Sequence, residues 1–517
     1  MRATLAMTDT RRIILNIAAT YGCSLVSLCC GLFTVRWMLM ALGEVDYGLF
    51  GVIGALMGFV AIFNEILAGG VRRFYGIAVG AGRADEVTAW FRVALWLHVA
   101  FAVILVAIGY PIGSWAIQRF IDVPANRIGD CLWVFRFSCA ACFVGMVSVP
   151  FGSMYTAKQE IAERTGYSLV QTLMTFGFLG WLVWARGGES NLVPVAAAIA
   201  TIGIGLNLAL IVRSSVKYSE CSLGKVSCFG SRVRELMGYS LCNAVQSVGY
   251  LLSVHGMAVF VNKAFGPIVN GALNVSNGLT GKAGTLSAAV QNAFVPVINS
   301  AYGAGDMGSV RKFALRMSKF SVLCIMVFAL PLIVELDEVL SIWLTNPPKG
   351  TVEIASLFLC VMMADAFASG CRTAIYASGD LKRFTIRCES LLLLTLPVAG
   401  VMWWCGMGVW SIGASYLVVT ALNVVGRVWF ARGIVGVSGR AWARELLLPV
   451  LSTAALTLAV GVAARRLFSG RFDSQVFDVA WTVVACEIVF VPIVLLKVLS
   501  PQERQWIVNR ILQRAGK

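Results

Sequence analysis

Long apolar runs alternate with short polar segments along nearly the whole chain. A run of about 20 apolar residues is long enough to cross the hydrocarbon core of a bilayer as a helix. A helix satisfies its own backbone hydrogen bonds there, where no water is available. The pattern therefore predicts an all-α polytopic membrane protein. We expect about fourteen transmembrane helices, at 13–34, 48–68, 90–112, 131–153, 167–186, 192–212, 237–262, 268–297, 317–335, 353–376, 387–406, 409–430, 446–464 and 477–497.

The composition strengthens this prediction and excludes other classes. The 517 residues are 58% hydrophobic and 13% charged, with a mean hydropathy of +0.80, whereas soluble domains carry about 25% charged residues. The fifteen cysteines are scattered and many lie inside the apolar runs, where cysteine acts as a small apolar residue. Their spacing matches no zinc site, and the lone His98 and His255 are weak evidence for a metal or a proton relay. We expect no metal and no cofactor.

Basic residues are unevenly divided between the two sides of the predicted membrane. The net charge is +16, but the cations form no continuous stripe, so nucleic acid is not an expected partner. The side that holds both termini carries 29 Lys and Arg, and the other side nine. Cytoplasmic loops are enriched in Lys and Arg, so both termini are expected in the cytoplasm. Arg11 and Arg12 precede a run too long for a signal peptide, which predicts a retained first helix.

The chain repeats itself at long range. LGEVDYGLFGV at 42–52 and FGPIVNGALNV at 265–275 share Gly43 with Gly266 and Gly48 with Gly271, a shift of 223. GAGRADEVTAWF at 80–91 and GAGDMGSVRKFA at 303–314 match at the same shift, and a third pair, Tyr155 and Tyr376, lies 221 apart. Chance recurrence of small residues explains one such match better than three in order.

The repeat predicts two copies of a six-helix unit. Six is even, so both copies have the same orientation, and they should surround a central cavity about a pseudo-two-fold axis along the membrane normal. We therefore expect an N-terminal bundle at 1–212, a cytoplasmic linker at 213–236 and a C-terminal bundle at 237–435. Two extra transmembrane helices at 436–500 and an amphipathic cytoplasmic tail at 501–517 complete the chain.

Charged residues inside the spans are costly and mark candidate sites. The basic candidates are Arg36, Arg73, Arg136, Lys282 and Arg372. If their side chains converge, they form a cationic cavity for an anionic headgroup such as a diphosphate. For cations near span ends, snorkelling to the interface is the alternative. Glu65 and Asp365 are candidates for proton or sodium coupling, and a structural salt bridge is their alternative.

Two polar stripes lie on the seventh and eighth predicted spans. They recur at helical spacing and predict a polar cavity lining, formed by Asn243, Gln246, Tyr250, Asn274 and Asn277. Hydrogen bonding between buried helices would give the same pattern.

Several stretches resemble bacterial polysaccharide-biosynthesis flippases of the multidrug/oligosaccharidyl-lipid/polysaccharide (MOP) exporter superfamily. They are TVRWMLMALGEVDYGLFGVIGAL and GGVRRFYGIAVGAG in the first half, and VNKAFGPIVNGALNVSNGL and RTAIYASGDLKRF in the second. The resemblance covers roughly residues 10–435. It implies a flippase that moves a polyprenyl-diphosphate-linked oligosaccharide from the cytoplasmic to the outer leaflet by alternating access, for O-antigen, capsule or exopolysaccharide export. It also implies a bacterial inner-membrane location and a central cationic cavity.

Two other functions compete with this interpretation. An ion-coupled multidrug exporter of the same superfamily would favour an acidic or aromatic cavity over these cations. A membrane enzyme would need a large external loop with catalytic residues, and the chain has neither such a loop nor the Walker A, GxSxG or HExxH motifs. We expect a non-enzymatic monomer in the bilayer whose substrate is the lipid-linked oligosaccharide, working beside polysaccharide polymerase machinery.

Overall fold

The described part of the chain is almost entirely helical. The structure is a computed structural model that describes residues 2–158, 160–185, 191–224, 229–238, 252–344, 346–378, 381–468, 470–471, 474–501 and 503–504. Ten helices among these residues are long and apolar enough to cross a membrane, or eleven if one bent pair counts as a span. The protein is therefore a multi-pass membrane protein, as predicted.

The predicted count of fourteen spans stays a prediction. The first two predicted spans both lie in α1, which consists of two helices joined across a kink at Gly43. The eighth predicted span corresponds to α8, which is long enough to cross a membrane but rich in Asn and Gly. It is not among the ten helices that are both long and apolar enough. Half of the seventh, residues 239–251, lies outside the described residues.

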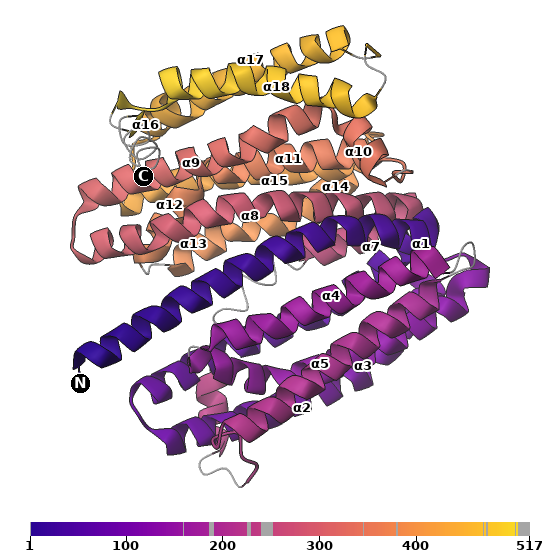
Figure 1. The fold of residues 1–517 in the computed structure, drawn as a ribbon, viewed down its shortest axis with the longest axis vertical. Coiled ribbons are helices and arrows are strands. Elements are labelled where there is room, and N and C mark those ends of the chain that lie inside the picture. Colours follow the sequence, from indigo (N-terminus) through magenta and orange to yellow (C-terminus); the bar gives the residue numbers. More distant parts are fainter. Residues whose placement is uncertain are drawn as a thin grey trace. The chain divides into compact units, whose positions relative to one another are not determined.

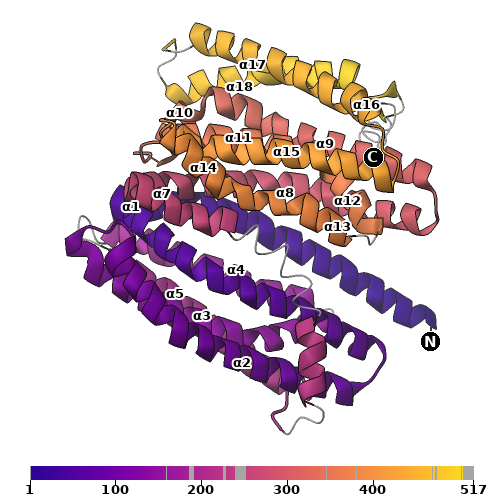
Figure 2. The same cartoon turned by 180° about the vertical axis from the view of Figure 1, so that it is seen from behind.

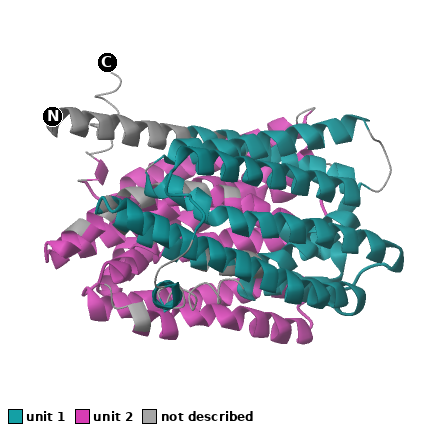
Figure 3. Ribbon diagram, turned by 90° about the horizontal axis from the view of Figure 1, so that it is seen from below, with its two compact units in different colours: residues 1–274 teal, residues 275–517 magenta. Residues whose placement is uncertain are grey.

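Two compact units divide the chain, residues 1–274 and 275–517 (Figure 3). The first unit includes α7 and the start of α8, because α7 packs against α1. Its boundary thus falls later than the linker predicted at 213–236, and the division into two six-helix bundles stays a prediction.

The first unit is a bundle in which α3 packs against α2 and α5, and α1 against α3 and α4 (Figures 1 and 2). Its core lies among α1, α2 and α3 and includes the fully buried Tyr75, Phe91 and Tyr155. Its helices are α1 (Arg2–Gly80), α2 (Ala84–Trp115), η1 (Ala116–Phe120), η2 (Ala125–Arg127), α3 (Ile128–Ala157), α4 (Ile161–Ala185), α5 (Leu192–Lys217), η3 (Leu252–Gly256), α7 (Met257–Phe265) and the first turns of α8 (Pro267–Gly303).

The second unit is organised around α9, which packs against α11, α12, α17 and α18. The helices α17 and α18 lie side by side (Figure 1). Beyond the end of α8, the unit consists of α9 (Met307–Val334), α10 (Leu336–Leu344), α11 (Thr351–Ala366), α12 (Ser369–Ser378), α13 (Leu381–Arg387), η4 (Glu389–Leu394), α14 (Thr395–Trp404), α15 (Trp410–Ile434), α16 (Gly439–Trp442), η5 (Ala443–Leu447), α17 (Leu448–Phe468), α18 (Gln475–Ile493) and η6 (Val494–Val498).

The shift of 223 found in the sequence recurs in the backbone. The helices α2 and α9 begin at 84 and 307, and α3 and α11 at 128 and 351. Gly43 has φ 73° and ψ 175° where α1 is interrupted, and Gly266 has φ 82° and ψ −179° between α7 and α8. Such positive φ values favour glycine, which has no Cβ to clash. The paired glycines therefore place the same break at the same point of each repeat.

Just beyond these breaks, two helix starts cross at very short range within the first unit. A Cβ added to Gly48 would lie 1.8 Å from the carbonyl oxygen of Pro267, and one added to Gly271 would lie 3.2 Å from that of Glu44. Glu44 and Pro267 are themselves 223 residues apart. The contact is thus reciprocal between repeat-related positions, and at Gly48 only a residue without a Cβ permits the approach.

The start of the C-terminal tail is fixed by a capping box. The Ser500 amide donates to Glu503 Oε2 at 2.9 Å, and the Glu503 amide donates to Ser500 Oγ at 3.3 Å. The Glu503 carboxylate is buried and also pairs with Arg316 and Lys319 of α9, at 3.1 and 3.3 Å. Burial alone would raise the pKa of Glu503, but the Ser500 amide and the Lys319 ammonium outweigh it and hold that pKa below its ordinary value. The predicted amphipathic helix beyond 504 lies outside the described residues.

We expect Glu503→Gln to loosen this anchor by removing both ion pairs while keeping an acceptor for the cap. Hydrogen exchange at neutral pH should speed up roughly tenfold at residues 496–504, since charge-assisted hydrogen bonds contribute about 1.5–3 kcal/mol. A depressed pKa stabilises the folded state above the ordinary glutamate pKa of about 4.3, and that stabilisation is lost as pH falls through the folded value. The difference between the two proteins should therefore vanish at strongly acid pH. A difference that persists there would contradict the ion-pair explanation.

Candidate functional site

The tenth predicted span, 353–376, is broken in the middle. The helices α11 and α12 meet at a bend of 45° around Phe367 and Ala368. Sharp kinks without proline are typical of Gly and Ser pairs, and Ser369 and Gly370 stand directly after the break. The Ser369 hydroxyl donates to the Ala366 carbonyl at 3.0 Å, and the Gly370 amide donates to Ser318 Oγ of α9 at 3.0 Å. The break is thus held open by specific hydrogen bonds.

A buried guanidinium bridges two carboxylates at this break. Arg427 Nη1 donates to Asp365 Oδ1 at 2.5 Å, and Arg427 Nε donates to Glu389 Oε1 at 3.3 Å. The Arg427 side chain is 3% exposed, that of Glu389 12% and that of Asp365 41%. The cation therefore lies inside the unit, while the Asp365 carboxylate keeps an accessible face.

Close packing brings Cys388, which directly precedes η4, against α15. Arg427 and Asn423 are one turn apart on α15, and Asn423 Oδ1 accepts from Cys388 Sγ at 3.0 Å. A Cβ on Gly426 would lie 2.8 Å from Cys388 Sγ. The glycine thus lets the segment around Glu389 approach α15 closely enough for Arg427 to reach both carboxylates.

Arg372 completes the charge balance. It lies in the first turn of α12 and acts electrostatically on Asp365 in the last turn of α11. Among the residues that the structure describes, it forms no ion pair within 4.0 Å. A carboxylate at a helix C-terminus and a cation at a helix N-terminus both oppose the local helix dipole. The two charges are thus placed where the backbone disfavours them, and the opposing charges of the cluster offset that cost.

This arrangement leaves Arg372 able to receive an anion. Arg427 pairs directly with both carboxylates. Arg372 supplies the second positive charge at longer range, so its N–H groups are not held in an ion pair with the described carboxylates. A guanidinium at a broken transmembrane helix suits a phosphate-type group, which it can bind through two parallel hydrogen bonds. The pair Asp365–Arg427 is the structural salt bridge considered for Asp365, and its use in ion coupling stays a prediction.

The other predicted site residues are placed as follows. In the first unit Arg36 is half-buried on α1, and Arg136 is exposed on α3. A Cβ on Gly51 would lie 1.5 Å from Asn274 Nδ2, so the Asn274 side chain lies close against α1. Asn277, in the second unit, is exposed. The side chains of Glu65, Arg73 and Lys282, and the whole of Asn243, Gln246 and Tyr250, lie outside the described residues.

The structure therefore brings only Asp365 and Arg372 of the predicted set into one described cluster. Arg427 and Glu389, which complete it, were not predicted. Arg427 lies in the last turn of the expected span 409–430, where snorkelling to the interface is the alternative for a cation, whereas α15 continues to Ile434. The signal that would have identified it is the polar stripe of Asn423 and Arg427 at helical spacing.

Comparisons with known proteins show the fold but no sequence relative. No family model matches the chain, and no curated protein matches it. The structure of the lipid II flippase MurJ in an inward closed conformation aligns with a TM-score of 0.67 at 8% identity, covering 93% of this chain and 98% of MurJ. An inward-facing multidrug resistance MATE family transporter aligns with a TM-score of 0.66 at 12% identity, covering 83% of this chain and 99% of that one. The eukaryotic MATE transporter AtDTX14 gives 0.57 at 14% identity, with 85% and 98% covered.

These similarities show the fold: the chain is a helical membrane protein folded like the lipid II flippase MurJ and these MATE family transporters. The inward-facing MATE family transporter among them is described as a member of the MOP superfamily. At 8–14% identity the comparisons speak for the fold alone.

Proposed function

We propose that this protein is a secondary transporter that moves a polyprenyl-diphosphate-linked oligosaccharide from the cytoplasmic to the outer leaflet by alternating access. The observation that carries the proposal is the extent of the similarity to the lipid II flippase, which spans 93% of this chain, against 83% for the similar MATE transporter. The helix pair α17 and α18, which follows the two repeats, is consistent with the longer match.

The charge pattern supports an anionic substrate. The predicted cavity cations are Arg36, Arg73, Arg136, Lys282 and Arg372, and Arg372 stands at a broken helix without a direct ion pair among the described residues. Discontinuous helices near the midplane are where secondary transporters bind substrate. In this proposal Arg372 contacts the diphosphate, and the protein acts as a monomer in a bacterial inner membrane, with both termini in the cytoplasm, beside polysaccharide polymerase machinery.

The proposal predicts a transport defect in Arg372→Ala. A strain lacking the protein is complemented with wild type or variant, and lipid-linked glycans are assigned to leaflets with a glycosidase restricted to the periplasm. Loss of a charge-assisted contact of about 1.5–3 kcal/mol should slow translocation at least tenfold, with glycan accumulating in the inner leaflet.

The control is Arg383→Ala, which removes an exposed arginine of α13 in the same unit. It should export glycan normally at the same protein level in the membrane. Normal glycan turnover in the deletion strain, together with new sensitivity to cationic dyes, would replace the flippase with a multidrug exporter of the same superfamily.

A further inference from the structure

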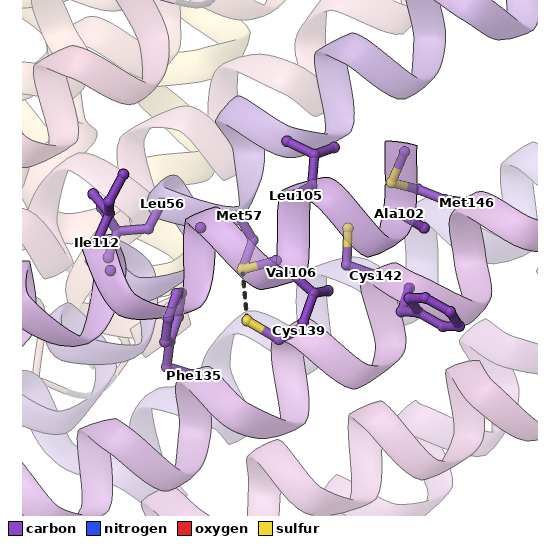
Figure 4. Close-up of a pocket in the computed structure, with 13 residues that line it drawn as sticks. Leu56, Met57, Ala102, Leu105, Val106, Ile112, Phe135, Cys139, Cys142 and Met146 are labelled. Carbon is purple, nitrogen blue, oxygen red and sulfur yellow. Dashed lines mark hydrogen bonds between the residues drawn. The ribbon is translucent and has the colours of Figure 1, made fainter. Parts of the chain in front are cut away.

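An apolar pocket lies within the first unit, between α1, α2 and α3 (Figure 4). Its volume is about 250 Å³, and its wall includes Leu56 and Met57 of α1, Leu105 and Ile112 of α2, and Phe135 and Phe143 of α3. Ile112 is 60% exposed, whereas Ala102 and Met146 at the other end of the wall are at most 1% exposed. The pocket thus opens near the end of α2 and is closed deeper in the bundle.

A cation and two aromatic rings stand at the open end. Arg136 directly follows Phe135, and Tyr110 follows Gly109, and both preceding residues line the pocket. Arg136 Nε donates to the Tyr110 hydroxyl at 2.9 Å, which joins α3 to α2. The Arg136 guanidinium lies 4.6 Å from the centroid of the Trp133 ring. Its side chain is held in place, and it forms no ion pair within 4.0 Å in the described part of the chain.

This end of the unit carries the features of a membrane interface. Trp115, Phe120 and Trp133 are exposed there. Large aromatic side chains gather at the level of the lipid headgroups, where one part of the ring is in hydrocarbon and another meets water. Arg136 therefore lies at headgroup depth, with the apolar pocket extending from it toward the bilayer interior.

We propose that this pocket and Arg136 bind one anionic phospholipid of the surrounding bilayer. Part of an acyl chain occupies the pocket, and the guanidinium holds the lipid phosphate through its free N–H groups. A volume below the roughly 300–1,000 Å³ of pockets for drug-sized ligands admits a segment of one chain, not a whole amphiphile. The proposal assigns Arg136 to lipid binding instead of the substrate cavity predicted from the sequence.

The energetics identify the headgroup as the selective part. A chain that leaves the bilayer for the pocket gains no hydrophobic free energy, because lipid tails are as apolar as the wall. Packing and the arginine–phosphate contact must supply the preference, and charge-assisted hydrogen bonds are about twice as strong as neutral ones. Anionic lipids should therefore bind in preference to zwitterionic ones, through Arg136.

The test uses the full chain in nanodiscs, titrated with phosphatidylglycerol or phosphatidylcholine and followed by native mass spectrometry and thermal stability. Phosphatidylglycerol should be retained and should raise the melting temperature, and Arg136→Gln should weaken its binding roughly tenfold. Arg119→Gln, which removes an exposed arginine in η1 at the same end, should bind as wild type does. Equal weakening of phosphatidylglycerol binding in both variants would mean that the lipid responds only to the general positive charge of the surface, and it would overturn the proposal.

A second variant tests the pocket itself. Gly109 lines the pocket, and a Cβ there meets no atom within 4 Å, so Gly109→Phe fills the space without backbone strain and should also displace the lipid. Gly145→Phe, on α3 outside the lining and equally unhindered, is its control. Undiminished binding in Gly109→Phe would overturn the acyl-chain assignment. Retention of polyprenyl diphosphate in place of phosphatidylglycerol would overturn the bilayer-lipid source and return Arg136 to the substrate. None of these readouts depends on transport, so the result stands apart from that of the proposed function.

Discussion

Replacing Arg427 by glutamine should destabilise the second unit by about 3 kcal/mol. The variant keeps the size of the side chain but leaves the carboxylates of Asp365 and Glu389 together without their cation. Removal of one partner of a buried ion pair costs about 3–5 kcal/mol, since an uncompensated charge remains. The lower end applies because Asp365 is 41% exposed and partly solvated. Denaturant titration of the purified protein measures the loss directly.

Two further variants separate charge from packing at Arg427. The triple variant Asp365→Asn, Glu389→Gln, Arg427→Gln removes all three charges and should recover most of the lost stability. Arg432→Gln removes an exposed cation from the same helix and should change stability by less than about 0.5 kcal/mol. If the triple variant is no more stable than Arg427→Gln, the ion cluster is not what holds α11, α15 and η4 together.

The same cluster marks the limit of what the sequence could predict. The hydropathy pattern predicted one continuous span at 353–376. The break before Ser369 and Gly370 is not visible in hydropathy, because the segment stays apolar across it. Asp365 was identified by its charge, but its partner was not, because Arg427 lies in the last turn of the predicted span 409–430, where a cation can snorkel to the interface. Which carboxylates Arg427 contacts is set by packing in three dimensions, which a hydropathy window does not contain.

The polar stripe of α8 illustrates a second limit. Asn274 was predicted to line a cavity, and interhelical packing was the alternative. Both interpretations require a polar residue at helical spacing, so the stripe alone cannot separate them. The structure adds Gly51, which stands 223 residues earlier and whose missing side chain leaves space for the Asn274 amide, and the cavity lining stays a prediction.

The internal repeat was the most informative feature of the sequence, because it depends on backbone geometry. No other residue replaces a glycine that provides a positive φ or a close approach. Such glycines therefore occupy matching positions in the two repeats, whereas the apolar residues at matching positions differ. Gly43 and Gly266 are matched in this way, as are Gly82 and Gly305, with φ of 70° and 74°. The starts of the helices that follow these glycines could therefore be matched between the repeats from the sequence. The contacts of the side chains within those helices could not be predicted in this way.

The reciprocal crossing of α1 and α8 predicts a graded response to the smallest possible substitution. Gly48→Ala places a methyl group 1.8 Å from a backbone oxygen of Pro267, which cannot rotate away, so the two helix starts must separate. Overpacking of this kind costs about 1–3 kcal/mol and occasionally more, and a direct backbone clash belongs at the upper end. We expect a correspondingly large fall in melting temperature and in the amount of folded protein extracted from membranes.

The matched variants set the scale for this prediction. Gly271→Ala meets the Glu44 carbonyl at 3.2 Å, which a shift of a few tenths of an ångström relieves, so its cost should be well below that of Gly48→Ala. Gly54→Ala, in the same helix as Gly48, meets nothing within 4 Å and should be neutral or stabilising by up to about 1 kcal/mol, because alanine restricts the unfolded chain. The order of stability should therefore be Gly54→Ala, Gly271→Ala, Gly48→Ala. Similar losses for Gly48→Ala and Gly54→Ala would mean that the crossing is not closely packed in the membrane, and the reciprocal contact between the repeats would have to be abandoned.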